Sequence, residues 1–289
     1  MKEMTPMMKQ YYEVKNAHPD CIIMFRLGDF YEMFQEDAKL ASQELDLTLT
    51  TRDRGKPKEE QVPMCGVPYH AVQSYLARLI GKGYKVAICE QMEDPALAKG
   101  LVQREVTRIV TPGTIIDDTM LDEGKNNFIC AAAASDGMWG LCFADITTGD
   151  LFATAFDLDG SREHMWNELS RFRPREALLD ETAWSREAVH HFLEGKLGCV
   201  CQKAEMTADR KALEAQFETG LDRLPEDCDA VLAAAGAIVR YAAETQKSTL
   251  SHMRTLNYYT AEQFMELDLT ARRNLELLET LRAGEKRGS

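Results

Sequence analysis

Phe30 and Glu32 place an aromatic ring and a carboxylate two residues apart, directly after the turn pair Gly28-Asp29. In extended backbone successive side chains point to opposite faces, so Phe30 and Glu32 project together and Tyr31 projects the other way. Such a pair offers a flat apolar surface beside a hydrogen-bond acceptor. The spacing alone, however, favours a simpler interpretation, in which the aromatic residues of a hairpin pack in the core and Glu32 is solvated.

A second group of chemically active side chains is basic. The polar stretch 52–61 carries Arg52, Arg54, Lys56 and Lys58. A charge run of this kind is by default a solvated loop, and the functional alternative is a mobile arm that contacts phosphates.

Acidic residues raise the possibility of a nuclease. Asp145 follows an apolar run and precedes Thr147-Thr148-Gly149-Asp150, which is similar to the first-strand acid of ribonuclease-H-like enzymes. Those enzymes need several carboxylates that converge on two metal ions. Glu176 and Asp180 are poorly placed for this, and Thr-Thr-Gly-Asp is good turn chemistry in its own right. The sequence therefore favours a structural turn.

The cysteine pattern gives only a weak metal signal. Eight cysteines are scattered, mostly in apolar segments, and the spacing Cys199-x-Cys201 is the one short pair. His70, at the start of a predicted helix, has no second histidine close enough in sequence for a metal pair. Buried free thiols in a reducing cytoplasm explain this usage best, so we expect no metal ligands.

Composition and charge bound the remaining possibilities. The 289 residues, 45% hydrophobic and 28% charged, are enough for two domains and the beginning of a third. No apolar run approaches a membrane span, and the polar first residues argue against a signal peptide. The net charge of −13 argues against a general nucleic-acid binder. Residues 1–115 are nearly balanced, with 15 basic against 16 acidic residues, so a local basic face remains possible there.

The elements that must position these residues indicate an α/β protein. Residues 1–112 read as a mixed α/β domain, 113–127 as a linker, 128–249 as three antiparallel strands followed by alternating helix and strand, and 250–289 as the start of a helical segment. Strands are expected at 21–25, 46–51, 84–90 and 104–111, with a rigid connection at 63–68. Helices are expected at 6–18, 36–45, 70–82, 161–172, 185–195, 209–217, 227–245 and 264–282.

Five ordered sequence blocks give this chain a resemblance to the MutS family of DNA mismatch-recognition proteins. The blocks are Gly28-Asp29-Phe30-Tyr31-Glu32-Met33-Phe34, Pro63 to His70, Val86 to Gln91, Val110 to Thr114 and Leu267 to Glu276. The resemblance covers essentially the whole chain and only the N-terminal part of such a protein. It implies a mismatch-recognition domain in residues 1–112, a ribonuclease-H-like connector domain in 128–249 and the start of a helical core domain in 250–289.

The resemblance also implies roles for single residues. Phe30 is expected as a wedge at a mismatched step, Glu32 as its hydrogen-bonding partner, and Arg52, His70 and Arg104 as contacts to the DNA backbone. No catalytic or metal-binding residue is implied. The basic loop is longer than in some relatives, so the resemblance does not place Arg54, Lys56 and Lys58.

The expected partners follow from the same resemblance. They are mismatched duplex DNA, a MutL-type matchmaker at the connector domain and, for the full-length parent, a second copy in a homodimer. No Gly-x-x-x-x-Gly-Lys-Ser/Thr loop is present, so ATP and Mg are expected in the full-length parent and no cofactor in this chain. The acidic second part suits protein partners. The expected location is the bacterial cytoplasm, in association with the nucleoid.

Overall fold

The computed structural model describes residues 4–52, 61–93, 100–121, 125–159, 162–225, 228–247 and 250–260, together with residues 55, 57 and 274. The chain divides into two compact units, Met1–Glu123 with Ala243–Thr249, and Gly124–Ala242 with Leu250–Ser289. None of the helices in the described ranges combines the length and apolar character needed to cross a bilayer.

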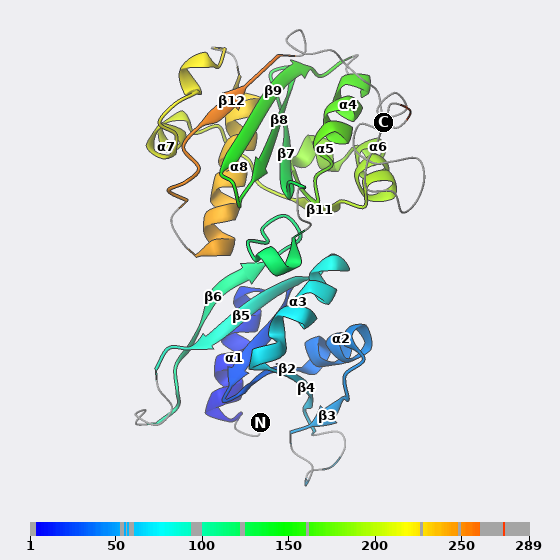
Figure 1. Ribbon diagram of the computed structural model, residues 1–289, viewed down its shortest axis with the longest axis vertical. Helices are drawn as coiled ribbons and strands as arrows, with labels where there is room; N and C mark the ends of the chain where they lie inside the picture. The colour runs from blue at the N-terminus through cyan, green and yellow to red at the C-terminus, as the bar shows by residue number, and fades with distance from the viewer. Residues whose placement is uncertain are drawn as a thin grey trace. The chain divides into compact units, whose positions relative to one another are not determined.

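The first unit is built on a six-stranded mixed sheet with the order β3-β4-β2-β1-β5-β6. Its strands are β1 (Cys21–Leu27), β2 (Phe30–Phe34), β3 (Thr50–Thr51), β4 (Pro63–Pro68), β5 (Lys85–Gln91) and β6 (Arg104–Val110). β1 and β5 are parallel, and the other neighbouring pairs are antiparallel (Figure 1).

Helices cover both faces of this sheet (Figure 1). On one face, α1 (Pro6–Ala17) contributes Met7, Met8 and Tyr11 to a core with alternate strand residues. On the other face, α2 (Gln35–Leu45) and α3 (Val72–Gly81) pack in a second core. Two 3-10 turns, η2 (Tyr69–Ala71) and η3 (Asp118–Met120), complete the unit. The Thr5 hydroxyl caps α1 by accepting from the Met8 amide at 3.4 Å, as the sequence predicted.

Two predicted elements of this unit, a connection and a strand, were wrong. Residues 63–68 form strand β4, paired with both β2 and β3, instead of a rigid link. Pro63 and Pro68 stand at the two ends of the strand, where the missing N–H groups disturb the ladder least. Conversely, the predicted strand over 46–51 is reduced to Thr50–Thr51, because only these two residues find a partner in β4.

The predicted linker, residues 113–127, is in part a packed segment of the first unit. Ile115 is buried in the core that contains α2 and α3. Thr114 is also buried, and its hydroxyl lies 2.8 Å from the Thr111 hydroxyl. Apolar and hydrogen-bonding groups in this segment therefore bury it despite its Pro-Gly start. Residues 122–124 lie outside the described ranges.

The second unit has a six-stranded mixed sheet with the order β11-β10-β7-β8-β9-β12. Its strands are β7 (Phe128–Ser135), β8 (Met138–Asp145), β9 (Asp150–Asp157), β10 (Glu176–Leu179), β11 (Val200–Lys203) and β12 (Leu256–Tyr258). β7, β8 and β9 form an antiparallel meander, and β10 and β11 add in parallel beside β7, which is the predicted ribonuclease-H-like layout. β12 pairs with β9, so the sheet continues past residue 249, where the sequence placed the end of the domain.

Helices lie on both faces of this second sheet as well (Figure 1). One face carries α7 (Arg210–Gln216) and α8 (Asp229–Gln246). The 3-10 turn η5 (Leu221–Arg223) lies between these two helices in the chain. On the other pack α4 (Arg162–Phe172), α5 (Glu181–Trp184), α6 (Glu187–His190) and the π-helical segment η4 (His191–Lys196). The single helix predicted over 185–195 is thus divided between short helical pieces. The helix predicted over 264–282 lies outside the described residues, apart from Asn274.

Small side chains allow α8 to approach this sheet closely. β7 is rich in alanine, and α8 opens with an alanine-rich segment. At the point of closest approach, a Cβ placed on Gly140 of β8 would lie 2.3 Å from the Ala230 carbonyl carbon. No side chain fits there without a shift of the helix backbone.

We therefore predict that Gly140→Ala destabilises the second unit by about 1–3 kcal/mol, the usual cost of overpacking. Urea unfolding followed by tryptophan fluorescence measures this unit selectively, since Trp139, Trp166 and Trp184 all belong to it. Gly195→Ala is the matched control in the same unit, because a Cβ at Gly195 meets only the His191 ring, at 3.5 Å or more. An unchanged midpoint for Gly140→Ala contradicts the close helix–sheet contact.

Candidate nucleic-acid interface

Hydrogen bonds hold the turn between β1 and β2 at both of its residues, Gly28 and Asp29. Gly28 has a φ of +59°, a left-handed conformation that glycine adopts at little cost. The Arg26 side chain donates through Nε to the Gly28 carbonyl. The Tyr69 amide donates to the Asp29 carbonyl at 2.8 Å. The next residue, Phe30, therefore starts β2 from a fixed position.

Phe30 projects outward from this turn. Phe30 is 48% exposed to solvent. Tyr31 is only 3% exposed and packs in the core shared with α2 and α3. The alternation predicted from the sequence is thus confirmed: Phe30 and Glu32 share one face of β2 and Tyr31 has the other. The ring is not sealed in the domain interior, so the hairpin-core interpretation is wrong for Phe30.

Glu32 is an acid in a poorly solvated position. Its Oε2 is buried without a hydrogen-bond partner in the described part of the chain, and the Arg52 guanidinium is 3.7 Å away. Burial raises the pKa of Glu32 above its usual value, and the Arg52 charge opposes that shift. The carboxyl group is therefore prepared to accept a hydrogen bond, or to hold a proton and donate one.

A glycine stands directly across the sheet from this acid. Gly66 of β4 pairs with Glu32, and a Cβ at Gly66 would lie 3.5 Å from the Glu32 Cγ. Because Gly66 carries no side chain, this position of β4 places no side chain beside Glu32.

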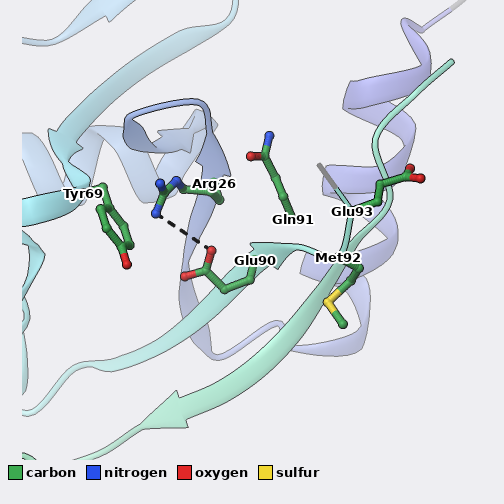
Figure 2. Close-up of a pocket in the computed structure, with 6 residues that line it drawn as sticks. All are labelled: Arg26, Tyr69, Glu90, Gln91, Met92 and Glu93. Atoms are coloured by element: carbon green, nitrogen blue, oxygen red, sulfur yellow. Dashed lines mark ion pairs between the residues drawn. The ribbon is translucent and has the colours of Figure 1, made fainter. Parts of the chain in front are cut away.

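A cluster missed at the sequence level supports the opposite face of the hairpin. The Arg26 guanidinium lies 3.5 Å from the centre of the Tyr69 ring and 4.0 Å from Glu90, whose carboxylate also accepts from the Tyr31 hydroxyl. Figure 2 shows Arg26 between Tyr69 and Glu90. A pocket of about 460 Å³ lies beside this cluster, lined further by Gln91, Met92 and Glu93. The predicted alternation put Tyr31 on this face, but sequence spacing does not reveal which distant residues meet it.

Two of the residues predicted at the DNA backbone, Arg52 and His70, have exposed side chains. Arg52 follows β3, with its side chain 39% exposed and its guanidinium 6.0 Å from the Phe34 ring centre. His70 is exposed in η2. Of the other basic residues in this loop, Arg54, Lys56 and Lys58 lie outside the described residues.

Arg104, the third predicted backbone contact, is placed differently. It is only 7% exposed, and burial lowers the pKa of its guanidinium. Its Nε donates to the Arg26 carbonyl at 2.7 Å, and its Nη1 donates to the Gln10 side chain at 3.1 Å and the Val102 carbonyl at 2.8 Å. Arg104 therefore joins α1, β1 and the start of β6 from inside the unit.

The acids of the second unit are engaged in structural hydrogen bonds. Asp145 is 1% exposed and accepts from the Asn127 and Thr147 amides at 3.0 and 2.9 Å. Asp180 caps α5 through the Ala183 amide at 2.7 Å. Glu176 accepts from the Tyr241 hydroxyl at 2.6 Å and the Gln202 amide group at 3.0 Å. Within the described ranges these carboxylates form no cluster suited to a metal ion, which supports the structural interpretation of Asp145.

Comparisons with known proteins connect this geometry to one family. Residues 5–119 match the family model described as MutS domain I, and residues 127–254 match MutS domain II. The chain is 45% identical to the DNA mismatch repair protein MutS of Ruminiclostridium cellulolyticum over 100% of this chain and 33% of that protein. It is 46% identical to the protein of the same name from Desulforamulus reducens, over 99% of this chain and 33% of that protein. The chain thus spans about a third of the length of these curated relatives.

The contact between Arg52 and Glu32 predicts a measurable shift. Arg52→Ala should raise the pKa of Glu32 further, because it removes the charge that opposes the effect of burial. The pKa is measured by NMR titration of the glutamate side-chain carboxyl carbons, with Glu32→Gln to assign the signal. Lys39→Ala, which breaks an exposed pair with Glu36, is the control and should leave Glu32 unchanged.

The same shift fixes the sign of a pH effect on stability. The pKa of Glu32 is higher in the folded protein than in the unfolded chain, so protonation of Glu32 favours folding. This contribution to the free energy of unfolding is fully present at pH values below the ordinary glutamate pKa. It is lost as the pH rises through the raised value, and Glu32→Gln should abolish this dependence. An identical Glu32 titration in wild type and Arg52→Ala contradicts the assigned contact.

Proposed function

We propose, from the premise that this chain belongs to the MutS family, that its first unit recognises mispaired or unpaired bases in duplex DNA during mismatch repair. The observation that carries this proposal is Phe30, an exposed aromatic ring at the end of a firmly held turn, with Glu32 on the same face. Single exposed apolar side chains are common on protein surfaces, so the support comes from the position of Phe30, directly after the held turn and on the same face as Glu32.

The physical basis of selectivity is the deformability of a defective base step. A mispaired step stacks poorly and bends at low cost, whereas perfect duplex resists a kink. A protein exploits this difference when it inserts an apolar wedge from the minor groove. Phe30 suits this task because its ring can stack on any base. The ties at Gly28 and Asp29 support a wedge that does not yield when it meets the stack.

Glu32 is proposed to contribute more to the discrimination between mismatched and matched DNA than to the overall affinity for DNA. An ionised carboxylate near phosphates is unfavourable, so its benefit depends on a donor from the disturbed base or on protonation of the carboxyl. The raised pKa of Glu32 and its unpartnered Oε2 in the described structure support both options. Gly66, directly across the sheet, adds no side chain that would compete for this space.

Arg52 and His70 are proposed to contact phosphates beside the wedge. Both are exposed, and contacts to phosphate fix position without reading sequence. Arg104 is instead proposed to act from within, because its Nε and Nη1 already donate to groups of the protein. It supports the end of β1 from which the turn departs.

For the longer protein, the family suggests further properties. We propose that the whole protein acts as an ATP- and Mg-dependent homodimer and that the acidic second unit contacts a MutL-type matchmaker. We also propose a location in the cytoplasm near the nucleoid. The charge supports a protein partner for the second unit, since residues 124–242 and 250–289 carry 26 acidic against 18 basic residues.

Phe30→Ala should abolish the preference for mismatched over matched DNA, because it removes the stacking wedge. We would measure fluorescence anisotropy with G·T, unpaired-T and matched duplexes at two salt concentrations, since affinity depends on salt. Leu49→Ala is the matched control: Leu49 is similarly exposed at 45%, in the same unit, and has no assigned contact with DNA. Retained discrimination in Phe30→Ala contradicts the wedge assignment.

Arg52 and Arg104 should respond differently to truncation. Arg52→Ala should weaken binding to all duplexes alike and reduce the salt slope by about 1, while it lowers stability less than Arg104→Ala does. Arg104→Ala should lower the stability of the first unit by about 1.5–3 kcal/mol, because hydrogen bonds from a charged donor are lost inside the unit. Urea unfolding followed by circular dichroism separates the two. A stable Arg104→Ala protein with only a reduced salt slope contradicts the internal role.

A further inference from the structure

We propose that the second unit binds a zinc ion through His190, Glu194 and Cys201, a site independent of the DNA-binding function. One ligand atom from each of these side chains lies within 4.8 Å of the other two. It is the one such group among the residues that the structure describes. His190 ends α6, Glu194 belongs to the π-helical segment η4, and Cys201 lies on the edge strand β11. π-helical segments occur frequently at functional sites.

The orientation of the His190 ring is the observation that points to a ligand. Its Nε2 lies 3.0 Å from the Trp184 carbonyl oxygen, which can only accept, so Nε2 carries the proton. In the neutral ring the lone pair is then on Nδ1. Nδ1 faces the Glu194 Oε1 at 3.6 Å, a second acceptor. A cation between these two acceptors, either a proton on Nδ1 or a metal ion, makes their approach favourable.

A metal ion fits this arrangement better than a proton alone. The separation of 3.6 Å is too long for a direct hydrogen bond from a protonated Nδ1. In a tetrahedral zinc site with Zn–N and Zn–O bonds of about 2.0–2.2 Å, neighbouring ligand atoms lie roughly 3.3–3.6 Å apart. Zinc-bound histidines also usually donate their other ring N–H to a carbonyl or carboxylate, which is the role of the Trp184 carbonyl here.

The ligand types select the metal. A thiolate, an imidazole and a carboxylate are the donors that zinc accepts, and sulfur disfavours Mg²⁺ and Ca²⁺. The charges of a Cys201 thiolate and the Glu194 carboxylate together balance a divalent ion. The buried Cys199 thiol donates to the Val200 carbonyl at 3.9 Å, in the strand that carries Cys201. Three protein ligands leave a fourth position for water.

The place of the site suggests what the ion does. β11 is the outer strand of the sheet, and η4 packs beside it on the face that contains α4 to α6. A metal bound to both would join the edge of the sheet to the helical layer. Trp184 provides a reporter, since its ring lies 4.5 Å from the His190 ring in an edge-on arrangement.

The test uses the tag-free 289-residue chain, stripped of metal under reducing conditions. Zn²⁺ is titrated against a chromophoric chelator, and Co²⁺ is added separately to detect the charge-transfer absorption of a cobalt–thiolate bond. We expect one equivalent of Zn²⁺, a cobalt–sulfur band and a change in tryptophan fluorescence. His190→Gln, Glu194→Gln and Cys201→Ser should each weaken binding at least about tenfold. His191→Gln, on the neighbouring exposed residue, is the matched control and should bind as wild type does.

Two results would overturn the proposal. One is the absence of stoichiometric Zn²⁺ binding by the wild-type chain. The other is binding that survives in His190→Gln and Cys201→Ser, which places the ion elsewhere. Unfolding in the presence of chelator checks that the variants fold. Glu194→Gln is decisive if they do not, because the Glu194 side chain is 54% exposed and its replacement preserves shape.

Discussion

The hydrogen bond between the Tyr69 amide and the Asp29 carbonyl constrains the turn of the first unit that presents Phe30. It adds to the strand pairing that already closes the turn, in which Phe30 stands opposite Leu27 of β1 and Pro68 of β4. With it, the strand direction of β2 is set before Phe30, and alternation then decides every side chain that follows. Exposure of Phe30, burial of Tyr31 and the position of Glu32 are three results of one backbone arrangement.

Much of this arrangement could be predicted from local sequence. Gly28-Asp29 predicted the turn, and the period of two in β2 predicted which side chains share a face. Exposure of Phe30 was beyond that reasoning, because an aromatic residue in a strand is by default a core residue. Only the order of the sequence blocks, which identified the family, changed that expectation.

What local sequence could not provide are contacts between distant segments. Arg104 alternates with apolar residues in β6 and reads as a surface cation, yet its guanidinium is turned inward to the Arg26 carbonyl. The strand at Pro63–Pro68 was missed because pairing on both sides overrides the low strand propensity of proline. In the second unit, by contrast, turn chemistry at Asp145 and Thr147 correctly predicted a structural acid, since those hydrogen bonds are local.

The inward position of Arg104 has a mechanical consequence. In the proposed wedge role, stacked bases would push back on the Phe30 ring, and the turn would transmit that force into β1. At the end of β1, Arg104 connects the backbone at Arg26 to Gln10 of α1 and to Val102. The thrust on a single side chain is thereby shared among a helix and two strands, so the tip can be stiff even though its own contacts are few.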